Sequence, residues 1–208
     1  MVTVVCTGGE EPPSSQSLAW LNASQRVIAA DGGLQWLRAL GRKADLWIGD
    51  GDSLSGPLEN WADSFHTAVV LPRDKDETDT EAAVRTAVAM GTAEIWLMGG
   101  SGGRMDHWWA NLRLVAGQPA IKRWLTGHEE AWNVGPGECQ NLPGGVISIF
   151  PLGQGPWSVS SRGLRWPLTG LDFSTCHSLS NEALPEALIQ VDQGRVLVMR
   201  PIEQGPSV

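Results

Sequence analysis

The chain has 208 residues, of which 42% are hydrophobic and 18% are charged, so it can bury a core in one large or two small domains. Its net charge of −8 argues against a nucleic-acid surface, which would be basic, but not against a nucleotide, because Mg²⁺ can mediate between acids and phosphates. Three scattered cysteines form no Cys-x-x-Cys pair, and no apolar run approaches membrane-spanning length. The first residues lack the basic start of a signal peptide. We therefore expect a soluble cytoplasmic protein that contacts neither nucleic acid nor membrane.

Strand and helix patterns alternate along the first half of the chain. Strands are expected where apolar runs are continuous, at residues 2–6, 26–30, 46–48, 68–71 and 93–98. Helices are expected between and after them, at residues 17–21, 34–40, 58–64, 79–90 and 106–115. This alternation, with strands that are apolar throughout, predicts an α/β domain with a parallel, Rossmann-like sheet covered by helices on both faces.

The pattern changes after about residue 117, where glycine and proline become frequent and helical periodicity disappears. Short strands are expected at residues 121–125, 130–134, 146–151, 157–160, 172–178, 187–192 and 195–199. Gln193-Gly194 is typical of a hairpin turn between the last two. We predict a C-terminal antiparallel β-sandwich at residues 131–208 after an α/β domain at residues 1–130, with the boundary somewhere between 118 and 143.

Two carboxylates follow the third expected strand, in the sequence Ile48-Gly49-Asp50-Gly51-Asp52-Ser53. Like charges this close repel one another unless a proton or a cation lies between them. A hard cation such as Mg²⁺, with phosphate oxygens completing its shell, is the usual solution. The alternative is a solvated acidic turn, because Asp and Gly are common in turns.

Other polar turns are expected at the same edge of the sheet. Asp31 follows the second strand, residues 74–79 follow the fourth, and the glycine loop at residues 99–104 follows the fifth. In open α/β sheets, ligands bind at the carboxyl ends of the strands. We therefore predict a binding site there, to which Asp79 contributes either as a ligand or only as a helix-capping acid.

The glycine loop Gly99-Gly100-Ser101-Gly102-Gly103-Arg104 precedes an expected helix. Free backbone N–H groups at a helix start can bind phosphate, and an arginine adds a fixed positive charge. The loop matches neither the Walker pattern nor G-x-G-x-x-G. Arg104 has an alternative role in an ion pair with Asp106, and His107 is either a general acid or base or a structural residue.

The ordered set of motifs resembles the thiamine pyrophosphokinase family over residues 29–182. The motifs are Ala30-Asp31-Gly32-Gly33, Gly49-Asp50-Gly51-Asp52-Ser53, Lys75-Asp76-Glu77-Thr78-Asp79, Gly99 to His107, Gly163-Leu164-Arg165-Trp166-Pro167-Leu168 and Ser180-Asn181. The chain departs from the family pattern at Ser101, where Ala-Thr or similar small residues are frequent, and at Trp108-Trp109, where smaller residues are usual.

The resemblance implies transfer of the pyrophosphoryl group of ATP to the hydroxyl of thiamine, giving thiamine diphosphate and AMP. It implies Mg²⁺ as cofactor and a homodimer with active sites between subunits. The expected metal ligands are Asp31, Asp50, Asp52 and Asp79, and the expected catalytic residues are Asp50, Asp52, Asp79 and Arg104. The expected nucleotide contacts are Asp31, Gly32, Gly33, Ser53, Gly102, Gly103, Arg104 and Asp106, and the expected substrate contacts are Lys75, Asp76, Ser180 and Asn181.

Two other functions stay open at this point. One is a Mg²⁺-dependent phosphohydrolase with Asp50 as nucleophile and Asp52 as acid and base. The other is a non-catalytic module that senses thiamine or a nucleotide. The number of carboxylates argues against sensing, since recognition alone does not need so many potential metal ligands.

Overall fold

The computed structural model describes residues 1–12 and 14–202, which form two compact units. Unit 1 comprises Met1–Leu114 and Arg123–Gly127; unit 2 comprises Val115–Lys122 and the described chain from His128 onward. None of the described helices is both long and apolar enough to cross a membrane.

Unit 1 contains the expected parallel sheet. Its strands are β1 (Val2–Cys6), β2 (Arg26–Ala30), β3 (Ala44–Gly49), β4 (Phe65–Val70) and β5 (Glu94–Met98). They lie in the order β5-β1-β2-β3-β4, all pairs are parallel, and β6 (Ile121–Leu125) continues the sheet beside β5. The central strand β1 is buried from Thr3 to Cys6, which explains why its sequence is apolar rather than alternating.

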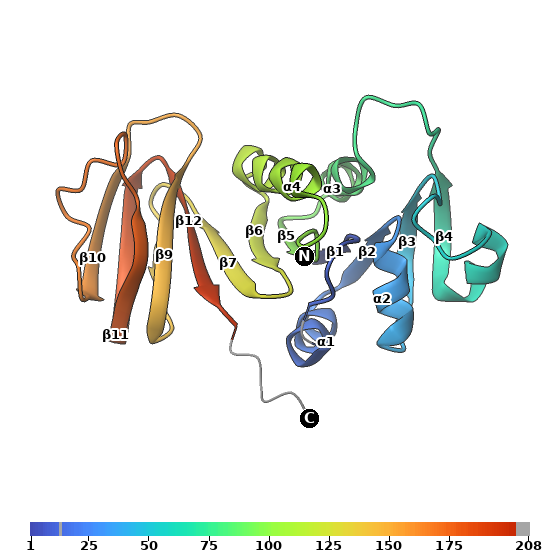
Figure 1. Cartoon of the computed structure of the whole chain (residues 1–208), viewed down its shortest axis with the longest axis horizontal. Coiled ribbons are helices and arrows are strands. Elements are labelled where there is room, and N and C mark those ends of the chain that lie inside the picture. Colours follow the sequence, from blue (N-terminus) through green and yellow to red (C-terminus); the bar gives the residue numbers. More distant parts are fainter. Residues whose placement is uncertain (13, 203–208) are drawn as a thin grey trace. The chain divides into compact units, whose positions relative to one another are not determined.

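Helices cover both faces of this sheet, as the sequence predicts. Figure 1 shows α1 (Ser14–Ala23) and α2 (Gly33–Ala39) on one face and α3 (Asp79–Ala89) and α4 (Met105–Gly117) on the other. A capping box, with the sequence pattern Thr78-x-x-Glu81, starts α3: Thr78 accepts a hydrogen bond from the Glu81 N–H, and the Glu81 carboxylate accepts one from the Thr78 N–H. Residues 58–64 form a 3₁₀ helix rather than an α-helix.

The strand order reverses at β1. The chain proceeds from β1 through β2 and β3 to β4 on one side, and then places β5 and β6 on the other side of β1. The loops that follow β1 and β5 therefore lie together: Thr7 N donates to Met98 O at 2.9 Å, and Gly100 N donates to Gly8 O at 2.8 Å. Such a reversal point is where open α/β sheets bind ligands.

Unit 2 is built from antiparallel strands. They are β7 (Glu129–Val134), β8 (Cys139–Asn141), β9 (Gly145–Leu152), β10 (Ser158–Leu164), β11 (Ser178–Gln193) and β12 (Arg195–Pro201). The long strand β11 pairs with β9 up to Ala183 and with β8 from Leu188, and Glu186 between them has φ = 63°. A strand that changes partners at a bend joins the two layers of a sandwich. The fold class predicted from the sequence is thus confirmed.

Two predicted features of this half are wrong, and one strand was not predicted. Residues 172–177 form no strand, and residues 173–175 are a turn, because Asp172 Oδ1 accepts hydrogen bonds from Ser174 N at 2.9 Å and Ser174 Oγ at 2.6 Å; Ser178 begins β11. Residues 193–194 join β11 to β12, but β9 lies between these strands, so they form no hairpin. The three-residue strand β8 carries no apolar pattern that could have predicted it.

Gly33, at the start of α2, packs against the end of β1. A Cβ atom there would lie 2.3 Å from Cys6 O and 2.9 Å from Thr7 N, which are backbone atoms of the central strand. We expect Gly33→Ala to lower the free energy of unfolding by about 2–3 kcal/mol through overpacking. Gly117→Ala is the control, because its Cβ would meet nothing within 4 Å. Urea denaturation of both variants measures the difference, and equal losses would contradict this packing role.

Candidate functional site

A pocket of about 250 Å³ opens at the carboxyl end of the unit 1 sheet. Five segments line it: the loop after β1, the end of β2, the turn after β3, the start of α3, and the glycine loop with the first turns of α4. The residues that line the pocket include Thr7, Gly8, Gly9, Asp31, Gly32, Ser53, Thr78, Asp79, Thr80, Ser101, Gly102, Gly103, Arg104, His107 and Asn111. The pocket coincides with the reversal point of the strand order, where a ligand is expected.

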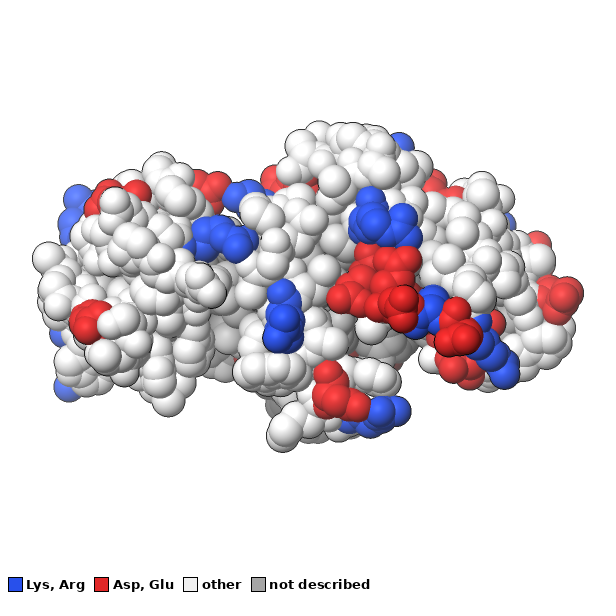
Figure 2. Space-filling model, turned by 90° about the horizontal axis from the view of Figure 1, so that it is seen from above, with Lys and Arg blue, Asp and Glu red and all other residues white. Residues whose placement is uncertain are grey.

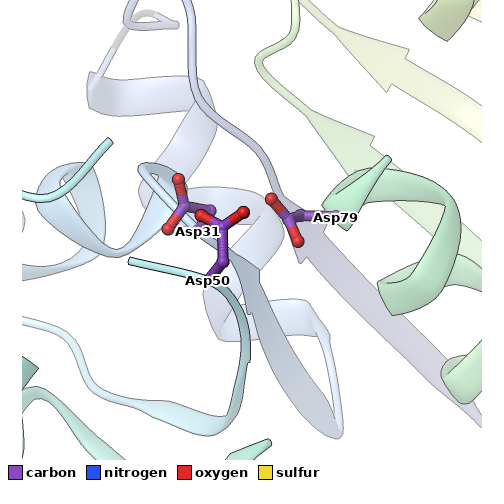
Figure 3. A group of neighbouring side chains, drawn as sticks. All are labelled: Asp31, Asp50 and Asp79. Carbon is purple, nitrogen blue, oxygen red and sulfur yellow. The ribbon is translucent and has the colours of Figure 1, made fainter. Parts of the chain in front are cut away.

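Three carboxylates meet beside this pocket. Asp31, Asp50 and Asp79 each offer an oxygen, and these oxygens all lie within 4.8 Å of one another. Figure 3 shows the three side chains, which come from the ends of β2 and β3 and the start of α3, turned toward one another. Figure 2 shows acidic side chains gathered in one patch with basic side chains at its border. Oxygen ligands in this arrangement suit a hard divalent cation.

Asp31 connects the carboxylate cluster to the acidic turn. Its side chain is buried, and its two oxygens accept hydrogen bonds from Gly51 N and Ser53 N, each at 3.1 Å. Its φ of 39° lies in the left-handed region, which Asp tolerates better than most residues. A Cβ at Gly49 would lie 2.9 Å from Asp31 Cβ, so glycine is required there for this close approach. Asp31 thus holds the turn that carries Asp50.

Lys75 is the cation within the cluster. Its Nζ donates to Asp50 Oδ2 at 3.0 Å and lies 3.3 Å from Asp79 Oδ1. Burial opposes ionisation of Asp50, but the hydrogen bonds from Lys75 and Asp52 N lower its pKa below the ordinary value. Burial raises the pKa of Asp79, and the nearby charges of Asp31 and Asp50 raise it further, against the opposing effect of Lys75.

Asp52 and Asp76 lie outside the group of three carboxylates. Asp52 is exposed, and its Oδ1 accepts a hydrogen bond from Ser53 Oγ at 3.1 Å. Asp76 is also exposed and does not line the pocket. Of the predicted metal ligands, the structure therefore brings three together and leaves Asp52 outside the cluster.

The glycine loop is held by hydrogen bonds to its backbone carbonyl groups and to the Ser101 hydroxyl. Glu10 N donates to Ser101 O at 2.6 Å, and Ser101 Oγ accepts from Gly127 N at 3.3 Å. The indole of Trp124 donates to Gly99 O at 2.7 Å. Gly102 and Gly103 have φ values of 72° and 64°, which favour glycine. The loop therefore lines the pocket with backbone and with little side-chain bulk.

Arg104 lies at the end of this loop and pairs with Asp106. Arg104 Nε and one terminal nitrogen bind the two Asp106 oxygens at 3.1 and 2.6 Å, which confirms the ion pair that the sequence suggested. The Arg104 side chain is 71% exposed, so the pair leaves donors directed to solvent. His107 is exposed at the pocket wall rather than packed in the core.

Sequence reasoning missed several residues of the pocket. Thr7, Gly8 and Gly9 follow β1, and Thr7 Oγ1 lies 2.6 Å from Thr80 Oγ1 in a buried hydrogen bond. Their position after an apolar strand, with two glycines, was an available signal. Asn111, one turn after His107, also lines the pocket and donates to Gly100 O at 3.0 Å.

Ser180 and Asn181 belong to unit 2, and both lie in β11. Ser180 is exposed and has φ = 52°, next to an irregularity in the pairing with β9. Asn181 is 1% exposed. Its Oδ1 accepts from Trp166 N and Glu182 N, and its Nδ2 donates to Trp166 O and Ser178 Oγ. Its amide is fully occupied by the protein itself.

Two family models match this chain. The catalytic domain of thiamin pyrophosphokinase matches residues 18–124, and its vitamin B1 binding domain matches residues 138–196. Comparison with the sequences of curated proteins gives no significant match.

Similar solved structures include two bacterial and one fungal thiamin pyrophosphokinase. The Bacillus subtilis enzyme has a TM-score of 0.78 at 21% identity, over 98% of this chain and 100% of its own. The Geobacillus thermodenitrificans enzyme has a TM-score of 0.77 at 23% identity, over 99% of each chain. The Candida albicans enzyme has a TM-score of 0.76 at 13% identity, over 97% of this chain and 89% of its own. At these identities the likeness concerns the fold alone.

Proposed function

Because the chain belongs to the thiamin pyrophosphokinase family, we propose that the carboxylate cluster and the glycine loop of unit 1 are its catalytic site. The chain is a thiamine diphosphokinase, which transfers the pyrophosphoryl group of ATP to the hydroxyl of thiamine. The convergence of Asp31, Asp50 and Asp79 beside the pocket carries the site assignment. The carboxylates and a triphosphate need a shared cation between them. The glycine loop supports the assignment because its backbone N–H groups can donate to phosphate oxygens.

The donor set fits Mg²⁺. Three carboxylate oxygens lie within 4.8 Å of one another, and Asp79 Oδ1 accepts no hydrogen bond from the described residues but is ion-paired with the Lys75 ammonium at 3.3 Å. When bound, Mg²⁺ would neutralise charge on the transferred phosphoryl groups and on the departing AMP. Asp31, Asp50 and Asp79 would hold it, and Asp52, the fourth expected ligand, lies outside the cluster.

The reaction needs a base and donors for the phosphate oxygens. The thiamine hydroxyl oxygen forms a bond to the β-phosphorus of ATP, and the bond from that phosphorus to the AMP oxygen breaks. We assign the hydroxyl proton to Asp52, which is exposed and lies outside the cluster. Arg104, oriented by Asp106, and the N–H groups of Gly102 and Gly103 would bind phosphate oxygens.

The nucleotide would lie along the remaining pocket wall, against Gly32 and Ser53, while Lys75 and Asp76 would contact substrate from the loop before α3. In this proposal residues 1–130 bind ATP and the metal, and residues 131–208 bind thiamine. A cytoplasmic location agrees with the use of ATP.

We further propose a homodimer with each active site between subunits. The two sets of substrate contacts belong to different units of the chain, which is the observation that supports it. Light scattering should give twice the chain mass of 22.4 kDa. A monomer that retains full activity would contradict the proposal.

Ser180 and Asn181 should have separable effects. Asn181→Ala removes four buried hydrogen-bonding contacts, so we expect it to lower the free energy of unfolding by about 2–4 kcal/mol. Ser180→Ala changes an exposed residue and should raise the KM for thiamine about tenfold, with an unchanged melting temperature. Thermal unfolding and the KM values for both substrates test this. An unchanged thiamine KM in Ser180→Ala would remove Ser180 from the site.

Incubation with ATP, Mg²⁺ and thiamine, followed by separation of the products, tests the function against its rivals. We expect AMP and thiamine diphosphate in equal amounts, with no AMP when thiamine is omitted. Phosphate release without thiamine, or a trapped aspartyl-phosphate on Asp50, would indicate the phosphohydrolase. Ligand binding without turnover would indicate the sensing module.

A further inference from the structure

Lys75 occupies the position of a cation between carboxylates. Its ammonium lies 3.0 Å from Asp50 Oδ2 and 3.3 Å from Asp79 Oδ1, two of the three acids whose oxygens lie within 4.8 Å of one another. The side chains of Lys75, Asp50 and Asp79 are 14%, 9% and 19% exposed, so water screens these charges poorly. The lysine thus neutralises part of a like-charge cluster.

The cluster carries three negative charges against the single positive charge of Lys75, when all four groups are ionised. Without the ammonium, the carboxylates would face one another across a poorly screened space, and folding would be opposed by their repulsion. A divalent cation held by the same oxygens would remove that repulsion, but it would also repel the ammonium at this distance. Both cations therefore cannot use the same oxygens.

We propose that Lys75 is the resident counter-ion of the metal-free site and that a divalent cation must displace its ammonium in order to bind. This inference rests on the proposed metal site and adds a competition to it. Because the ammonium must be displaced, the apparent affinity for the metal is lower. When metal is absent, the same ammonium keeps the site folded. A cation therefore offsets part of the negative charge of the site in both states.

The chain around Lys75 allows such a movement. Lys75 lies between β4 and α3, in a segment whose neighbours Pro72, Arg73, Asp74 and Asp76 are all exposed. Its other contact is a hydrogen bond to Pro72 O at 3.2 Å, within the same segment. A displaced ammonium can therefore turn toward solvent, or toward the phosphates of a bound nucleotide, without disturbing the sheet.

A permanent phosphate ligand is the competing role for Lys75. In that case the lysine would affect the KM for ATP but not the binding of metal alone. The two roles differ in sign: removal of a displaced counter-ion strengthens metal binding, whereas removal of a mere phosphate ligand leaves it unchanged. Titration with Mg²⁺ in the absence of nucleotide separates them.

The experiment compares Lys75→Met, Lys75→Arg and Lys43→Met with the unaltered full chain. Lys43 is exposed and precedes β3, so Lys43→Met removes the same charge away from the cluster. Calorimetric titration gives the Kd for Mg²⁺, and thermal unfolding in EDTA gives the stability of the metal-free protein. We expect the Kd of Lys75→Met to be at least about tenfold lower, and its Tm in EDTA to be lower by at least about 4 °C and restored by Mg²⁺.

Lys75→Arg keeps the charge and should resemble the unaltered chain in both measurements, as should Lys43→Met. If Lys75→Met binds Mg²⁺ with unchanged or weaker affinity, the competition is overturned while the metal site stands. If the unaltered chain and all three variants bind no Mg²⁺ without nucleotide, and none loses stability in EDTA, both the competition and the nucleotide-free metal site are wrong. Thiamine diphosphate formation by the unaltered chain remains an independent test of the proposed function.

Discussion

Asp50→Asn is expected to lower kcat by at least about 10²-fold at saturating Mg²⁺, ATP and thiamine. Asp50 joins the three-carboxylate cluster and accepts the hydrogen bond of Lys75. Its replacement by Asn would remove a charged metal ligand, and the amide N–H groups would face an ammonium. A hundredfold loss corresponds to about 2.7 kcal/mol of transition-state stabilisation, which is within the range that one metal ligand supplies.

Asp63→Asn is the matched control, because Asp63 is an exposed acid of the same unit in the 3₁₀ helix before β4. It should keep nearly full kcat. The melting temperature of each variant shows whether a loss of activity reflects unfolding. A folded Asp50→Asn enzyme with near-normal turnover would show that the metal is held elsewhere.

Arg104→Met is expected to lower kcat/KM for ATP by about 10²-fold. The guanidinium is largely exposed at the pocket wall and is held by Asp106, so it has donors available for phosphate oxygens. Loss of one oriented donor to developing charge typically costs 10²- to 10³-fold, and the solvent exposure of Arg104 favours the lower end. Arg104→Lys should recover part of the loss, because it keeps the charge but not the planar fork.

Arg113→Met controls for the change in net charge, since Arg113 is exposed on the same helix α4. Steady-state kinetics with varied ATP measures all three variants. Equal kcat/KM values for Arg104→Met and Arg113→Met would assign Arg104 to the surface pair with Asp106 alone.

Much of unit 1 could be predicted because its signals are local. Apolar runs that end just before Asp31 and Asp50 predicted two of the strands. The acids that follow them predicted the candidate site at the carboxyl ends of these strands. The Thr78-x-x-Glu81 pattern located the start of α3, where Asp79 lies. In each case a short stretch of sequence determines the backbone that positions the carboxylate.

The remaining features depend on contacts between distant segments. The pocket wall at Thr7 depends on β5 lying beside β1, and strand order has no signature in periodicity. Asn181 was expected to bind a substrate, but its side-chain amide forms hydrogen bonds with the backbone of Trp166. Whether Lys75 meets carboxylates or a substrate depends on the path of the loop between β4 and α3.

The indoles that hold the two site loops also make the pocket visible to spectroscopy. The chain has eleven Trp and no Tyr, so its fluorescence comes almost entirely from tryptophan. Trp47 donates to Asp31 O and Trp124 to Gly99 O, and both rings are buried. An aqueous quencher such as iodide reaches Trp109 and Trp166, which are 57% and 54% exposed, far more readily than those two. The fluorescence that iodide does not quench is therefore enriched in emission from buried rings such as Trp47 and Trp124, which are hydrogen-bonded to the segments that carry Asp31 and the glycine loop.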